Sequence, residues 1–165
     1  MRALRWVVVL AVIVAGAMLA DCFVGVQTAD PAGSRVRLPG ALPAIDAAQY
    51  PSLQAAIDAL PAAGGAVRLP PGTFEIREPL KITVGDVLLE GAGTATHIKN
   101  VNTEGKSAIL LQHPSGADTN KADLWRIRLA NFRVTGNEKS GHGIEARRIN
   151  EIFIEGVTSS YHGGD

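Results

Sequence analysis

The stretch Tyr50–Ile76, "YPSLQAAIDALPAAGGAVRLPPGTFEI", joins one short helix pattern to one short strand pattern. Ser52 is a favourable N-cap, because its hydroxyl oxygen can accept a hydrogen bond from a free N–H of the first turn. The apolar residues that follow share one helical face: Leu53, Ala56, Ile57 and Leu60. Pro61 cannot continue the helix, and Gly64-Gly65 supplies a left-handed exit. A helix this short is marginal alone, so we expect its apolar stripe to cover another element.

Beyond this helix, apolar residues alternate with polar ones in short segments. Val67 and Leu69 fall on one face, with Arg68 on the other. The same alternation recurs in Phe74 and Ile76, and in Leu80, Ile82 and Val84. The turns between the segments are too short to hold a helix, so the pattern predicts strands of about three to five residues. The 18 glycines and an aromatic content of only 5% also favour a turn-rich β protein over a helical bundle.

Three later segments repeat one pattern: an apolar residue, any residue, an apolar residue, any residue, Gly or Asn, and an apolar residue. They are Val87–Ala92, Ile127–Phe132 and Ile152–Val157. The fifth positions are Gly91, Asn131 and Gly156, and Gly and Asn best tolerate left-handed backbone. We therefore expect a sharp corner with left-handed backbone at all three positions.

Short strands with one corner per repeat predict an all-β fold, a right-handed parallel β-helix with an N-terminal capping helix. Its core would be formed by the inward residues Ile127, Leu129, Phe132, Ile152, Ile154 and Val157. The stripe of the N-terminal helix has the right size to cover the open end of such a stack. The alternative is a β-sandwich with a surface helix, which would not explain the repeated corner residue.

Residues 1–26 resemble a targeting segment, because Arg2 and Arg5 precede an unbroken apolar run, Trp6–Ala20. Export to the outside of the cell or to the cell envelope is therefore expected. Three outcomes stay open: cleavage near Ala15-Gly16-Ala17, lipidation of Cys22, or retention as a membrane anchor. Asp21 departs from the lipoprotein pattern, in which a small residue precedes the cysteine. Residues 27–49 are expected to be a linker, because they contain several Pro and Gly and no periodicity.

The charge balance argues against one class of partner, nucleic acid, and the cysteine count excludes an intrachain disulfide bond. The 16 basic and 16 acidic residues give a formal net charge of zero, so no nucleic-acid partner is expected. Membrane contact is expected only through the N-terminal segment. With Cys22 as its single cysteine, the chain cannot form an intrachain disulfide bond.

From Tyr50 to Asp165 the chain resembles the pectate-lyase-like β-helix superfamily. The resemblance rests on "SLQAAIDALPAAGGAVRLPPGTFEI" (52–76) followed by "LKITVGDVLLEGAGTATHI" (80–98). This opening is shared by polygalacturonases, rhamnogalacturonases, pectate lyases, uronan epimerases and phage tailspikes. The resemblance implies a carbohydrate-active protein that acts on uronic-acid polysaccharide as a lyase, hydrolase or epimerase, with calcium as the cofactor of a lyase. It also leads us to expect that residues 50–165 are only the N-terminal part of a longer β-helix.

The sequence assigns no catalytic residue, cofactor site or metal site. Gly141-His142-Gly143 has the letters of a polygalacturonase motif, but the Asn-Thr-Asp and Asp-Asp motifs that accompany it in that family are missing, so His142 is interpreted as a turn residue. The other histidines, His97, His113 and His162, have no ligand-like spacing. Facing carboxylates cannot be paired with confidence among Asp86, Glu90, Glu145, Glu155 and Asp165. His142, Glu145, His162 and Asp165 would be the first residues to mutate.

These observations lead to one expectation and two alternatives. We expect an exported carbohydrate-active protein whose 165-residue chain shows no cleavage of polygalacturonate by itself. The alternatives are a non-catalytic glycan-binding module and a structural β-helix stalk.

Overall fold

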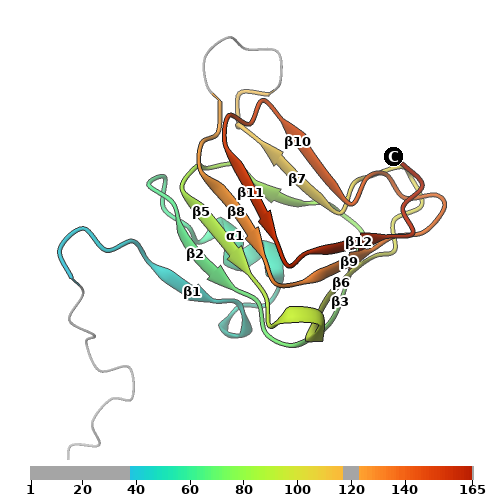
Figure 1. Ribbon diagram of the computed structural model, residues 1–165, viewed down its shortest axis with the longest axis horizontal. Helices are drawn as coiled ribbons and strands as arrows, with labels where there is room; N and C mark the ends of the chain where they lie inside the picture. Colours follow the sequence, from blue (N-terminus) through green and yellow to red (C-terminus); the bar gives the residue numbers. More distant parts are fainter. Residues whose placement is uncertain (1–37, 117–122, 165) are drawn as a thin grey trace, which may run out of the picture. The chain divides into compact units, whose positions relative to one another are not determined.

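The structure, a computed structural model, describes residues 38–116 and 123–164 (Figure 1). The targeting segment 1–26, residues 27–37 of the expected linker, and Asp165 lie outside the described residues. All the described strands belong to a compact unit that begins at Pro39. Within the described ranges, no helix combines the length and the hydropathy that a membrane crossing needs.

The helix expected after Ser52 is present as α1, Leu53–Asp58, preceded by the short helix η1, Ala47–Gln49. The Ser52 hydroxyl accepts a hydrogen bond from the Ala55 N–H at 3.1 Å, so the predicted N-cap is confirmed. The helix is only six residues long, and Leu60 lies beyond its end. All four residues of the predicted stripe are nevertheless buried.

The strands form three sheets. Sheet A runs in the order β1 (Ala44–Asp46), β2 (Gly65–Arg68), β5 (Val87–Glu90), β8 (Ile127–Ala130) and β11 (Ile152–Glu155). Sheet B contains β3 (Gly72–Ile76), β6 (Thr96–Asn100), β9 (Arg133–Thr135) and β12 (Thr158–Ser160). Sheet C contains β4 (Leu80–Ile82), β7 (Ile109–Gln112) and β10 (Ile144–Arg147). A one-turn helix, η2 (Gly93–Ala95), lies between β5 and β6.

From β2 onward the chain visits sheets A, B and C in turn and then returns to sheet A, and we call each such passage a coil (Figure 1). Every pairing between the described strands is parallel. An antiparallel sandwich is therefore excluded. The protein is all-β with three parallel sheets, an arrangement compatible with a parallel β-helix.

The three repeat segments found in the sequence lie in one register. Val87 pairs with Ile127, and Ile127 pairs with Ile152, on β5, β8 and β11. Ile127 thus lies one coil away from Ile152 on parallel strands, as expected of repeat segments that stack in a parallel β-helix.

The predicted core is correct for five of its six residues. Ile127, Leu129 and Phe132 are buried, and Ile152 and Val157 pack partly buried against the core. Ile154 was expected to be buried but is 52% exposed, although its register partner Leu129 is completely buried. The reason is that β11 is the last strand of sheet A, so no described strand covers its far side.

The corner prediction is correct at two positions and wrong at the third. Asn131 and Gly156 have φ values of +58° and +62°, as a left-handed corner requires. Gly91 does not have a positive φ. A Cβ atom there would lie 2.5 Å from the Asn131 carbonyl oxygen and 2.9 Å from the Phe132 Cβ, so glycine is needed for close packing between coils.

The helix α1 packs against β4, the edge strand of sheet C. The Gln54 side chain bonds the free edge of that strand as a neighbouring strand would. Its Oε1 accepts from the Lys81 N–H at 2.8 Å, and its Nε2 donates to the Lys81 carbonyl at 3.1 Å. The edge of β4 is therefore satisfied by a side chain, which blocks pairing with a further strand at this point.

Asparagine side chains hold together the loops that lead from sheet B to sheet C. Asn100 Nδ2 donates to the Lys106 carbonyl at 2.9 Å, and Asn102 Oδ1 accepts from the Glu104 and Lys106 N–H groups. Asn137, one coil later, donates to the carbonyls of Asn100 and Asn102. These bonds connect two successive coils and give the backbone groups of the loops hydrogen-bond partners.

Candidate functional site

Two adjoining hollows lie along the side of the molecule where sheet C leads back to sheet A. A hollow of about 220 Å³ and a hollow of about 390 Å³ share Thr83, His113 and Pro114 in their walls. We call them together the Trp125 groove. The residues of the groove that carry chemistry are Lys81 and Gln112 in the smaller hollow, and Asp86, Asp123, Trp125 and Arg126 in the larger.

Trp125 presents a large aromatic surface to solvent while its backbone is held firmly. Its carbonyl accepts a hydrogen bond from the Asp86 N–H at 2.9 Å, across the boundary between two coils. A Cβ atom on Gly85 would lie 2.9 Å from the same carbonyl oxygen, so glycine is what allows this approach. The Trp125 side chain is 46% exposed, which is unusual for the largest apolar residue type. The coil contact thus fixes the base of the residue and leaves the indole ring available.

Asp86 and Arg126 form an ion pair across the same corner. Both have left-handed backbone, with φ values of +55° and +52°. Arg126 Nε donates to Asp86 Oδ1 at 2.5 Å, and Nη2 donates to Oδ2 at 2.8 Å. The hydrogen bond from Arg126 lowers the pKa of the Asp86 carboxyl below its usual value, so Asp86 stays ionised at neutral pH. It can accept hydrogen bonds from a ligand but is unsuited to act as a general acid.

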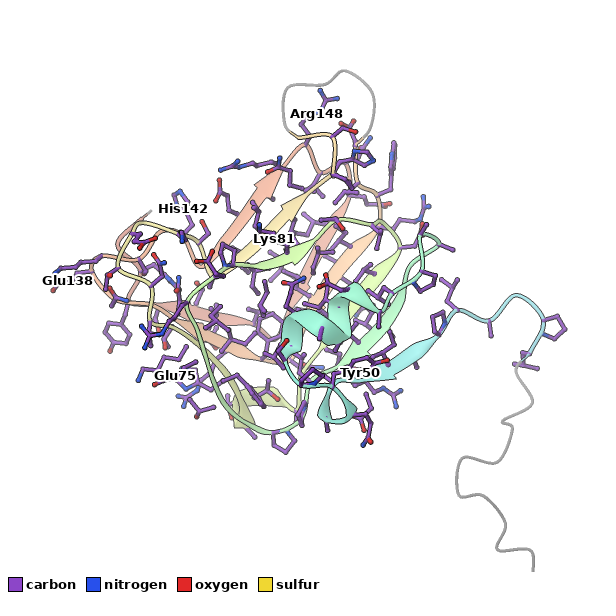
Figure 2. All side chains as sticks on the ribbon, turned by 180° about the vertical axis from the view of Figure 1, so that it is seen from behind. Tyr50, Glu75, Lys81, Glu138, His142 and Arg148 are labelled. Atoms are coloured by element: carbon purple, nitrogen blue, oxygen red, sulfur yellow. The ribbon has the colours of Figure 1, made fainter. Side chains whose placement is uncertain are left out.

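A second ion pair, Asp123 with Arg148, borders the larger hollow. Arg148 Nε and Nη2 both donate to Asp123 Oδ1, at 3.0 and 2.9 Å. The other carboxylate oxygen of Asp123 receives no hydrogen bond from the described residues. Arg148, which directly follows β10, is labelled in Figure 2. Both arginines here are committed to carboxylates, so the larger hollow has little free charge.

Lys81 supplies the cation of the smaller hollow. Its backbone N–H and carbonyl are both bonded to the Gln54 side chain, which fixes its position on β4 (Figure 2). Within the described ranges, the Lys81 ammonium lies within 4.0 Å of no carboxylate, in contrast to Lys99 and Lys106. His113 stands where the hollows join, and its Nδ1 accepts from the Ser115 N–H at 3.2 Å. The groove therefore has an aromatic residue in the wall of one hollow and, in the wall of the other, a lysine that pairs with no carboxylate of the described residues.

Of the residues singled out for mutation, the three that the structure describes, His142, Glu145 and His162, do not line this groove. Glu145 on β10 accepts from the Ser107 hydroxyl at 2.6 Å and from Arg147 Nε at 2.7 Å. The Ser107 bond lowers the pKa of Glu145 below its usual value. His142 is exposed in the loop before β10 (Figure 2), and its charge acts on both Glu145 and His162. The structure thus brings these three residues near one another, while Asp165 lies outside the described residues.

Two further titratable residues considered in the sequence, His97 and Glu155, are bonded to side chains of neighbouring strands. His97 on sheet B is bonded to Thr135 at 2.8 Å and to Arg133 at 3.2 Å, and partial burial lowers its pKa. Glu155 pairs with Arg128 on the outer face of sheet A. Among residues 38–116 and 123–164, no three His, Cys, Asp or Glu side chains gather in a way that could hold a metal ion. These residues do not fit a calcium site, so calcium stays a prediction of the resemblance.

The groove itself was missed in the sequence, although a signal for it was present. Val87 and Ile127 begin two of the repeat segments, and the residues just before them are Gly85-Asp86 and Trp125-Arg126. Extending the repeat alignment by two residues would have placed Trp125 over Gly85 and Arg126 over Asp86, where the structure has them. Lys81 carried no such signal, because its lack of an acidic neighbour depends on the packing of sheet C.

Comparisons with known proteins bear on the fold alone. No protein-family model matches the chain, and no curated protein matches it. A solved structure, ORF18 of Geobacillus virus E2, is similar with a TM-score of 0.53 and 19% sequence identity. The match covers 62% of this chain and 22% of the viral chain, so the present chain corresponds to about a fifth of that protein's length. At this identity the likeness concerns the course of the backbone and carries no information on activity.

Proposed function

We propose that the protein is a right-handed parallel β-helix of the pectate-lyase-like superfamily, exported through residues 1–26, with α1 as the cap of its first coil. Three observations support this proposal. The strands visit three parallel sheets in turn, the α1 stripe is buried, and Gln54 bonds the edge of β4. The motif resemblance at residues 52–76 and 80–98 is independent of these contacts.

We further propose that the module binds polysaccharide in the Trp125 groove. The observation that carries this proposal is the exposed indole of Trp125, held by a coil contact and flanked by the ionised acceptor Asp86. Sugars present apolar C–H faces to aromatic rings and hydroxyl groups to carboxylates. An exposed, rigid aromatic residue with a few placed polar groups is a typical arrangement for such a ligand.

Lys81 favours a polysaccharide that contains uronic acid. An ammonium with no carboxylate partner among the described residues can bind the carboxylate of a uronate residue, whereas a neutral sugar has no group of opposite charge. Because the two hollows share three wall residues, one glycan could reach both Trp125 and Lys81. The groove thus suits a short stretch of polysaccharide better than a single sugar.

A catalytic role as a lyase, hydrolase or epimerase is the second candidate, and one observation favours it. Glu145 is kept ionised by Ser107 and lies within the electrostatic reach of His142. An ionised carboxylate can act as a base towards a sugar C–H or a water molecule, but the lowered pKa makes Glu145 a weak base. Mutations can distinguish the two candidate functions, because binding in the groove would require Trp125 and turnover would require Glu145.

The binding proposal is tested by calorimetric titration of the 165-residue chain with oligogalacturonate and with neutral galacto-oligosaccharides of the same length. We expect Trp125→Ala to weaken binding of both ligands by about tenfold or more. Lys81→Ala should weaken only the oligogalacturonate. The matched controls are Phe153→Ala, an exposed aromatic residue on β11, and Lys139→Ala, an exposed lysine. Equal affinity of wild type and Trp125→Ala would refute the site.

The catalytic candidate is tested on polygalacturonate, with and without calcium. Ultraviolet absorbance reports unsaturated uronate ends, and a reducing-end assay reports hydrolysis. We expect no turnover from the 165-residue chain. Turnover that disappears in Glu145→Gln would establish the enzyme and would leave the binding proposal to be judged by the titration alone.

A further inference from the structure

The His162 ring fills a space that the preceding coil leaves open with two glycines. A Cβ atom on Gly136 would lie 2.4 Å from His162 Nδ1, and a Cβ atom on Gly143 would lie 2.7 Å from Nε2. His162 follows β12, whereas the two glycines belong to the coil of β9 and β10. The ring is therefore inserted into the preceding coil, and only glycine at both positions permits this.

Both nitrogens of this ring are buried, and neither makes a hydrogen bond within the described residues. A buried polar atom without a partner costs free energy, and the cost rises steeply if the group becomes charged. A neutral imidazole has one N–H to satisfy, whereas an imidazolium has two. The site therefore tolerates the neutral ring far better than the charged one.

We propose that His162 is an acid-sensitive latch, which holds β12 and residues 161–164 on the preceding coil when neutral and releases them when protonated. The bonds that would be lost are the pairing of β12 with β9 and the bond from the Gly136 N–H to the Ser160 carbonyl, 3.0 Å long. Release would uncover the edge of β9 in sheet B.

The side chains that face His162 from the loop 136–143, β10 and β12 offer its charged form no compensation. In the loop 136–143, His142 is the titratable group whose field reaches the ring, and its positive charge would repel a second one. Glu138 and Lys139 in the same loop are exposed. On β10, the Glu145 carboxylate is bonded to Ser107 and Arg147, and on β12 the three residues are neutral.

The pKa of His162 agrees with this geometry. Burial lowers it below the usual value of 6.5, the His142 charge lowers it further, and the Val134 backbone, which lies outside hydrogen-bond geometry, opposes the shift. Because the folded state binds a proton less readily than the unfolded state, stability is complete above pH 6.5 and falls as the pH decreases towards the lowered pKa. Each unit of lowering allows up to a roughly tenfold increase in the opening equilibrium constant on acidification.

The test compares hydrogen exchange of residues 158–160 at about pH 7.5 and about pH 5 in the 165-residue chain, after correction for intrinsic exchange rates. We expect protection of these amides to fall at the acidic pH, while protection of Ile98 and Leu129 is retained. His162→Phe, which cannot titrate, should abolish the difference, and Glu138→Gln should preserve it. If His162→Phe does not fold, an NMR titration of wild-type His162 decides. Unchanged protection in acid, or a His162 pKa at or above 6.5, would overturn the latch.

Discussion

The two ends of the strand stack differ in how their edges are covered. At the β1 end, β1 extends sheet A beyond β2, and Gln54 bonds the edge of β4. At the β11 end, Phe153 and Ile154 are 53% and 52% exposed. Leu129 and Ile154 are register partners in neighbouring coils, yet Leu129 is completely buried. An inward position in the repeat therefore becomes a core position only when a further element covers it.

The largest effect should come from truncating this register pair. Leu129→Ala should lower the free energy of unfolding by about 2–5 kcal/mol, because it leaves a cavity between two coils. Ile154→Ala should cost less than about 1 kcal/mol, because half of that side chain is already in water. Urea unfolding followed by circular dichroism measures both. Similar losses for the two variants would mean that the β11 end is covered in solution.

A smaller loss of stability is expected when the glycines of the repeated corner are replaced. Gly91 and Gly156 occupy the same position of the repeat, so their variants can be compared directly. Gly91→Ala should cost roughly 1–3 kcal/mol, because its Cβ would collide with the Asn131 carbonyl oxygen and the Phe132 Cβ of the next coil. Gly156→Ala should cost about 1 kcal/mol, since its φ of +62° disfavours any Cβ atom. The close contact there is with the Asn131 side-chain oxygen.

The same unfolding measurement tests the glycine pair, with Gly93→Ala as a control for left-handed backbone. Gly93 has a φ of +68°, and a methyl group on its Cα would meet no other atom within 4 Å, so the variant reports backbone strain alone. If Gly91→Ala were no more costly than Gly93→Ala, packing between coils would not be what requires glycine at this corner.

The smallest effect concerns the edge of β4 at the β1 end. Gln54→Ala should cost about 1 kcal/mol, because the Lys81 N–H and carbonyl lose their side-chain partner. Gln49→Ala, an exposed residue of η1, is the matched control and should be nearly neutral. Faster hydrogen exchange at the Lys81 amide in Gln54→Ala alone would confirm the edge bond. Unchanged exchange would show that solvent already competes for this edge.

The sequence predicted the elements that depend on local pattern. The Ser52 cap, the buried stripe from Leu53 to Leu60 and the register of three repeat segments are all present. These features follow from the periodicity of apolar residues, which can be recognised within a single segment of the sequence. Ile154 was mistaken for a core residue because the pattern shows which way a side chain faces and not what lies beyond it.

The features that the sequence did not predict depend on contacts between coils. Asp86 and Arg126 adopt left-handed backbone without being Gly or Asn, and the ion pair between them is available only once their coils are stacked. At Gly91 the opposite happened: the sequence predicted left-handed backbone, but the structure requires glycine there for close packing between coils. The Trp125 groove was missed for the same reason, because its two hollows take residues from three separate strand connections.

The single register row of sheet A has a consequence for how such a chain can change over evolution. Gly65, Val87, Ile127 and Ile152 occupy successive places in that row, although intervals of 22, 40 and 25 residues separate them. The stack therefore fixes the position of each strand and leaves the length of the connections free. Insertions between strands need not disturb the ladder, since a longer loop adds little closure entropy. New surface chemistry, such as the segment that carries Trp125, can accordingly be acquired or lost in one connection while the neighbouring coils keep their register.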